Sequence, residues 1–120
     1  MLGLGTDIIE IRRIENAVAR ERFFSRVYTP AEQQWLCSRG DNMPQSAAGL
    51  FCAKEAVAKA CGTGIGEGMS FQDIEIGHLE SGAPVVLRPA GRFALSISHC
   101  QEYATATAIL LADEGKKDQE

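Results

Sequence analysis

The chain has 120 residues and a formal net charge of −4, with 45% hydrophobic and 23% charged residues. This composition predicts one soluble globular domain, and the chain has neither a long apolar run nor a basic-then-apolar leader, so we expect no membrane span, no membrane partner and no secretion signal. The acidic balance argues against nucleic-acid binding, and four cysteines without a Cys-x-x-Cys pair favour a reducing, cytoplasmic location.

At the N-terminus a strand is predicted to lead into a helix. Leu2–Thr6 is a strand candidate whose two glycines allow another backbone or a ligand to approach closely. We expect an amphipathic helix over Ile8–Arg20, because apolar residues recur there at helical spacing, namely Ile8, Ile11, Ile14 and Val18. Asp7 lies at the junction, where it is either the N-cap of that helix or a functional carboxylate.

An arginine-rich stretch overlaps this helix. Residues 12–26 contain five arginines against two glutamates, a local balance of +3 in an acidic chain. Arg13 and Arg20, seven residues apart, fall on one exposed stripe of the predicted helix. A discrete basic surface of this kind suits one acidic partner better than it suits nucleic acid.

Two further helices are predicted. Thr29-Pro30-Ala31-Glu32 is a capping box with proline at the first helical position, and it predicts a helix to about Ser38. Ala47–Cys61 has small and apolar residues around most of its circumference, which predicts a central, largely buried helix. The charges that interrupt it are Lys54, Glu55 and Lys59. Glu55 and Lys59 share a face, so they are either a surface ion pair or part of a functional site.

The central helix is followed by glycines at positions 62, 64, 66 and 68. Phosphate-binding loops precede a helix and use its positive N-terminal end, whereas this loop follows a helix and meets the negative end. An anion here would need positive charge from Lys59 and a metal, with the loop amides acting as a nest. The alternative is a helix C-cap with a flexible connector.

The C-terminal part of the chain predicts strands. They cover Phe71–Ile76, Val85–Arg88, a stretch from Phe93 that closes at Ser98-His99, and Tyr103–Ala112. Early helices and late paired strands predict an α+β fold, and the alanine face of the last strand can lie against the central helix or a neighbouring subunit. His99 is either a hydrogen-bonded structural residue or part of a site. The domain is expected to span residues 1–112, followed by a disordered acidic tail over residues 113–120.

Several stretches, in matching order and spacing, carry a family resemblance from Leu2 to about Leu111. They are Gly3-Leu4-Gly5-Thr6-Asp7-Ile8-Ile9-Glu10-Ile11, Phe51-Cys52-Ala53-Lys54-Glu55-Ala56, Lys59-Ala60-Cys61-Gly62-Thr63-Gly64-Ile65, Phe71-Gln72-Asp73-Ile74-Glu75-Ile76 and Leu95-Ser96-Ile97-Ser98-His99. The chain strongly resembles the short bacterial holo-acyl-carrier-protein synthases, which are 4′-phosphopantetheinyl transferases.

The resemblance implies an enzyme that transfers the 4′-phosphopantetheine arm of coenzyme A to a serine of apo-acyl carrier protein. It would release adenosine 3′,5′-bisphosphate, depend on Mg²⁺ and support fatty acid biosynthesis. Asp7 and Glu55 match the family's metal ligands, and Mg²⁺ binds through few protein carboxylates together with water and substrate phosphates. Lys59, one turn beyond Glu55, would meet charge on the phosphates or on the serine. The general base is either a metal-bound water or a carboxylate.

The resemblance also implies contacts to coenzyme A and to the carrier protein. The candidates for coenzyme A are Lys54, Gly62, Thr63, Gly64, Ser98 and His99. The arginine-rich helix would dock an acidic helix of the carrier through Arg13 and Arg20, with Phe23 or Phe24 as an apolar anchor. The implied fold is a small antiparallel sheet packed against a long central helix, in a homotrimer whose active sites lie between subunits.

Four positions depart from the family pattern. Leu50 stands where an arginine that could touch a ligand phosphate or a neighbouring subunit is common, and Cys100 follows His99 where a threonine is usual. Ala17 and Val18 of the docking helix stand where bulkier apolar residues are frequent. The departures at Leu50 and Cys100 affect ligand contacts more than metal binding, because Asp7 and Glu55 are intact. They leave room for a second interpretation, a non-catalytic oligomeric module that binds coenzyme A or a related nucleotide and docks an acidic protein. A third is a structural oligomer with a surface ion pair.

Overall fold

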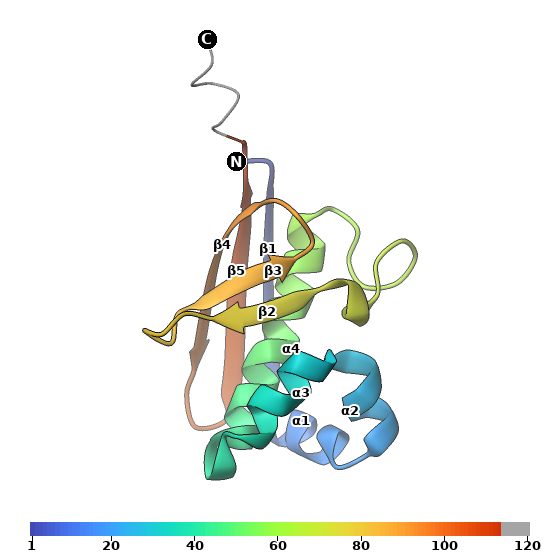
Figure 1. Cartoon of the computed structure of the whole chain (residues 1–120), viewed down its shortest axis with the longest axis vertical. Coiled ribbons are helices and arrows are strands. Elements are labelled where there is room, and N and C mark those ends of the chain that lie inside the picture. Colours follow the sequence, from blue (N-terminus) through green and yellow to red (C-terminus); the bar gives the residue numbers. More distant parts are fainter. Residues whose placement is uncertain (114–120) are drawn as a thin grey trace.

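The structure, a computed structural model, describes residues 1–113 and has an α+β fold (Figure 1). The expected acidic tail therefore lies outside the described residues, except for Asp113. The elements are β1 (Gly3–Glu10), α1 (Ile11–Val18), α2 (Glu21–Val27), α3 (Pro30–Cys37), α4 (Met43–Ala60), β2 (Glu75–His78), β3 (Pro84–Arg88), β4 (Arg92–His99) and β5 (Tyr103–Leu111), with single 3₁₀ turns at Gly40–Asn42 and Phe71–Asp73.

Strands β1, β5 and β4 form an antiparallel sheet in that order, and α4 packs against one face of it (Figure 1). The small side chains of Ala104, Ala106 and Ala108 in β5 are buried on this face. A Cβ atom at Gly5 of β1 would lie 1.9 Å from the carbonyl oxygen of Ala56, so only glycine permits this approach. The close backbone approach at the N-terminal strand and the packing of the alanine face against the central helix are both confirmed.

Helix α4 crosses the sheet obliquely. Its C-terminal half lies over Gly3 and Gly5 of β1, whereas its N-terminal half meets β4 through Gly49. Side chains that leave the helix sideways therefore fall on one of two flanks. Glu55 and Leu50 are five residues apart and leave the helix about 140° apart. We call the side that bears Glu55 the β1 flank and the side that bears Leu50 the β4 flank.

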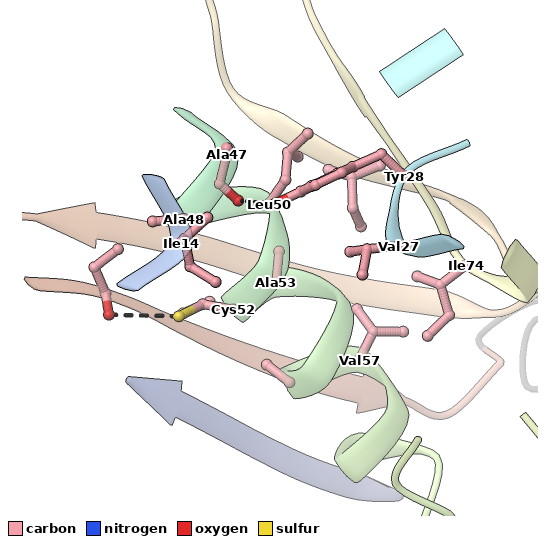
Figure 2. Close-up of a cluster of buried hydrophobic side chains, with 14 of the residues drawn as sticks. Ile14, Val27, Tyr28, Ala47, Ala48, Leu50, Cys52, Ala53, Val57 and Ile74 are labelled. Atoms are coloured by element: carbon pink, nitrogen blue, oxygen red, sulfur yellow. Dashed lines mark hydrogen bonds between the residues drawn. The ribbon is translucent and has the colours of Figure 1, made fainter. Parts of the chain in front are cut away.

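The core is built around α4, which buries residues along most of its length (Figure 2). Tyr28 is fully buried and donates a 2.7 Å hydrogen bond to the carbonyl oxygen of Ala47, and burial raises the pKa of this tyrosine well above its usual range. The predicted capping box is confirmed, because the Glu32 amide donates to Thr29 Oγ1 at 3.3 Å and the Thr29 amide donates to Glu32 Oε1 at 2.9 Å.

The prediction for the start of the first helix was wrong. Strand β1 runs through Glu10 and helix α1 covers only Ile11–Val18, so Asp7 lies inside a strand and is not an N-cap. The reason is long-range pairing, since β1 and β5 form a ladder in which Ile8 stands opposite Thr105. The apolar spacing from Ile8 onward favours a helix locally, but residues 8–10 pair with the distant strand β5 and are therefore extended.

Other boundaries also differ from prediction. The central helix begins at Met43, four residues before Ala47, with a proline in its first turn. The expected strand over residues 71–76 starts as a 3₁₀ turn, and the paired strand begins only at Glu75. Helix α2 was not predicted. Within the described residues, no helix is both long and apolar enough to span a bilayer.

Candidate active site

Asp7 and Lys59 come together on the β1 flank. Asp7 pairs with Ala106 across the sheet, so its side chain lies on the face that α4 covers. The Lys59 ammonium lies 3.3 Å from Asp7 Oδ1 and donates a 2.9 Å hydrogen bond to the carbonyl oxygen of Thr6. The Lys59 side chain is 47% exposed and that of Asp7 is 19% exposed, so the pair is open to a ligand.

Glu55 completes the cluster one turn before Lys59 on the helix. Burial raises the pKa of its carboxyl and the Asp7 carboxylate raises it further, while Lys59 lowers it. In residues 1–113 Lys59 forms its ion pair with Asp7, and none of the ion pairs there involves Glu55. The Glu55–Lys59 ion pair considered from the sequence is therefore not formed. The cluster thus contains two carboxyl groups and one ammonium, which leaves a net negative charge when both carboxyl groups are ionised.

This donor set fits a magnesium ion. Mg²⁺ prefers hard oxygen ligands and retains several waters, so two protein carboxylates suffice when a substrate supplies phosphate oxygens. In the described part of the chain no cluster of three or more His, Cys, Asp and Glu residues could hold a metal by itself. A cation would also relieve the repulsion that raises the pKa of Glu55.

Cys52 lies beside this cluster, and sequence reasoning did not single it out. Its thiol donates a 3.4 Å hydrogen bond to the carbonyl oxygen of Ala104. Burial raises the pKa of the Cys52 thiol to about 12, with Asp7 as the next cause, so the thiol stays protonated beside the carboxylates. The sequence did contain a signal for this contact, because Cys52 lies three residues before Glu55 and so falls near it on the helix surface.

Lys54 does not belong to the site. Its side chain is fully buried, and its ammonium lies 2.6 Å from Glu32 Oε1 and donates to the carbonyl oxygen of Val27 at 2.7 Å. The expectation that Lys54 contacts coenzyme A was therefore wrong. The residue is displaced by about 100° of helical rotation from Glu55 and enters the core beneath α3.

The glycine loop after α4 caps the helix. The amides of Thr63 and Gly64 donate to the carbonyl oxygen of Ala58 at 3.2 and 3.1 Å, and the amide of Gly62 donates to that of Lys59 at 2.9 Å. Gly62 and Gly64 have φ values of 85° and 67°, which glycine adopts without strain. The C-cap interpretation is confirmed, and these three amides are not free to form an anion nest.

Ser98 and His99 occupy opposite faces of β4, because consecutive strand residues alternate. His99 stands opposite the buried Ala104 and lines a pocket of about 200 Å³ on the β4 flank. Ser98 pairs with Thr105 and lies on the outer face of the sheet. The structure therefore separates His99 from Ser98, and α4 separates His99 from Asp7.

The predicted docking residues gather on the β1 flank. Arg13, Arg20 and Phe23 line a pocket of about 330 Å³ together with Phe51. The rings of Phe23 and Phe51 stack with centroids 6.1 Å apart, whereas Phe24 packs on Tyr28 at 5.6 Å. Phe51 is one turn before Glu55, so this pocket borders the carboxylates.

Comparisons with known proteins identify the family of this chain. A sequence model of the 4′-phosphopantetheinyl transferase superfamily matches residues 3–108. A holo-[acyl-carrier-protein] synthase of Chlamydia pneumoniae is 49% identical, over 93% of this chain and 98% of that protein. A crystal structure of the Bacillus anthracis synthase, in complex with CoA (3′,5′-ADP), is 40% identical with a TM-score of 0.83 over 91% of this chain and 95% of that one. The Helicobacter pylori synthase, in complex with coenzyme A, is 34% identical with a TM-score of 0.80 over 90% of this chain and 99% of that one. The chain therefore belongs to the 4′-phosphopantetheinyl transferase superfamily.

Proposed function

We propose that this chain is a holo-acyl-carrier-protein synthase, which transfers 4′-phosphopantetheine from coenzyme A to a serine of apo-acyl carrier protein in support of fatty acid biosynthesis. The observation that carries the proposal is the Asp7–Glu55 carboxylate pair with Lys59, set in a fold whose relatives bear this name. The serine oxygen attacks the phosphorus that bears the pantetheine arm, and the phosphoanhydride bond breaks. Adenosine 3′,5′-bisphosphate leaves, and the serine proton passes to a base.

Asp7 and Glu55 would hold Mg²⁺, which supplies positive charge beside the diphosphate of coenzyme A when bound. Lys59 is half exposed and, within residues 1–113, is held only by Asp7 and a backbone carbonyl, so its ammonium can turn toward a diphosphate oxygen or the incoming serine. The protonated Cys52 thiol and the buried helix face exclude water from the inner side of the pair.

The decisive experiment is the intact mass of apo-acyl carrier protein after incubation with this chain and coenzyme A. We expect a mass gain of one phosphopantetheine with Mg²⁺ and no gain after chelation. No gain under either condition, with coenzyme A still bound, would favour the non-catalytic binding module. A gain that persists in chelator would remove the metal from the mechanism.

We further propose that the carrier protein docks on the pocket of Arg13, Arg20 and Phe23. Support comes from its place beside Phe51, one turn from Glu55, and from its basic rim. Arg13→Glu is expected to raise KM for the carrier by roughly 10-fold or more with little change in kcat, because rim charges act mainly on association. Arg12→Glu is the matched control, since Arg12 neighbours Arg13 in sequence but lines a different groove. Equal effects of Arg13→Glu and Arg12→Glu on KM would contradict the proposal that the carrier docks on this pocket.

A homotrimer with sites between chains is the proposed assembly. The sheet face opposite α4 exposes Leu4, Ile8 and Tyr103 by 55%, 64% and 45%. The carboxylates and the His99 pocket lie on opposite flanks of α4, so one coenzyme A molecule would reach both only across two chains. Light scattering at micromolar concentration checks the assembly, and a monomer would contradict it.

A further inference from the structure

The pocket on the β4 flank contains one fixed positive charge. Among the described residues that line it, Arg39 is the only arginine or lysine. His78 lies beside it, but burial lowers the pKa of His78 and the Arg39 guanidinium lowers it further. His78 therefore contributes a neutral ring, stacked on Trp35 with centroids 4.0 Å apart. Arg39 is the cation of the pocket.

Arg39 is held in place without a carboxylate partner. Its guanidinium carbon lies 4.9 Å from the centre of the Trp35 ring, and its Nε donates a 3.1 Å hydrogen bond to Ser46 Oγ. None of the ion pairs within residues 1–113 involves it. The stacking and the single Nε bond leave the two terminal nitrogens of the fork available, which is the geometry that binds a phosphate through two parallel hydrogen bonds.

The same pocket offers an unsatisfied acceptor. Gln45 lines it, and its amide oxygen is buried without a hydrogen-bond partner in the described chain. A buried polar atom left unpaired is destabilising, and a ligand N–H group would satisfy it. Leu50, where the family commonly has an arginine, lines the pocket with an apolar side chain that is only 1% exposed.

We infer that Arg39 binds the 3′-phosphate of coenzyme A in this chain and supplies the positive charge missing at Leu50. The inference rests on the proposed function. Coenzyme A has a diphosphate and one phosphomonoester; the diphosphate must lie at Asp7 and Glu55 for transfer, so the phosphomonoester is the group left for a separate cationic pocket. An amino group on the adjoining base would meet Gln45.

The test compares the binding of coenzyme A and 3′-dephospho-coenzyme A by titration calorimetry, without carrier protein. The parent chain is expected to prefer coenzyme A. Arg39→Gln should weaken coenzyme A binding by roughly 10- to 100-fold while leaving 3′-dephospho-coenzyme A unchanged, so that the preference disappears. Arg39→Lys should retain part of the preference for coenzyme A, because lysine keeps the positive charge. Arg12→Gln removes the same charge elsewhere and should change neither affinity.

A preference that survives in Arg39→Gln would overturn the inference, and so would an equal loss of affinity for both ligands, which marks a structural role. Competition by inorganic phosphate tests whether the pocket recognises the phosphomonoester of the nucleotide or any free phosphate ion. If phosphate at millimolar concentration competes as well as adenosine 3′,5′-bisphosphate does, the pocket is a free-anion site and the inference fails. An absence of transfer by the parent chain, with its preference for coenzyme A intact, would contradict the proposed function but not the Arg39 inference, because only transfer requires the carboxylates.

Discussion

Glu55→Gln is expected to reduce phosphopantetheine transfer by at least roughly 10³-fold while the chain stays folded. Removing one preorganised charge-stabilising group from an active site costs about 10²–10³-fold, and here a metal ligand is lost as well. Glutamine keeps the size and the helix propensity of glutamate, so α4 and its packing should not change. The measurement is the rate of mass gain of the carrier protein, with circular dichroism to report the fold.

The same substitution should stabilise the metal-free chain. The folded-state pKa of Glu55 is raised, so the folded chain holds the proton more tightly than the unfolded chain and its stability falls as the pH rises through that pKa. Glu55→Gln removes this penalty. We expect the Tm of Glu55→Gln to exceed that of the parent at pH 7, and the difference to shrink as the pH falls and the parent carboxyl takes up its proton.

Magnesium provides an independent readout. Added Mg²⁺ should raise the Tm of the parent chain and leave that of Glu55→Gln unchanged, because a ligand stabilises only the state that binds it. Glu80→Gln, in an exposed turn between β2 and β3, is the matched control and should behave like the parent in all three measurements. Transfer by Glu55→Gln within a few-fold of the parent would exclude Glu55 as a metal ligand.

Local signals in the sequence predicted local structure well. The capping box at Thr29 formed with both of its hydrogen bonds, and the glycines at 3 and 5 allow the backbone contact inferred for them. The reason is that each pattern encodes a short-range interaction, a helix end or a missing Cβ atom. Asp7 was misplaced because its environment depends on a ladder with Ala106, which is 99 residues away in the sequence.

The three charged residues of the central helix show the same limit. Periodicity placed Glu55 and Lys59 on one face and Lys54 off it, but it could not identify the partner of Lys54. That partner is Glu32, 22 residues earlier on another helix, and the pairing is visible only once α3 packs on α4. The family motif groups Lys54 with Glu55 in sequence, whereas the structure assigns one to the core and the other to the site.

Lys54→Met is expected to lower the free energy of unfolding by about 3–5 kcal/mol, because it leaves the Glu32 carboxylate buried without its cation. Glu32 cannot move to solvent, since its oxygens also accept hydrogen bonds from the amides of Thr29 and Ile76 at 2.9 and 2.8 Å. The Val27 carbonyl would lose its donor as well. The Tm should fall by roughly 10–20 °C, measured by thermal and urea unfolding.

Lys59→Met is the matched control on the same helix. Its ion pair with Asp7 is largely solvated, and such pairs contribute at most about 1 kcal/mol, so stability should hardly change while transfer falls. The two lysines are thus expected to show opposite profiles, with stability lost at Lys54 and activity lost at Lys59. Unfolding of Lys54→Met at the urea midpoint of the parent would mean that the buried pair does not hold α3 and β2 to α4.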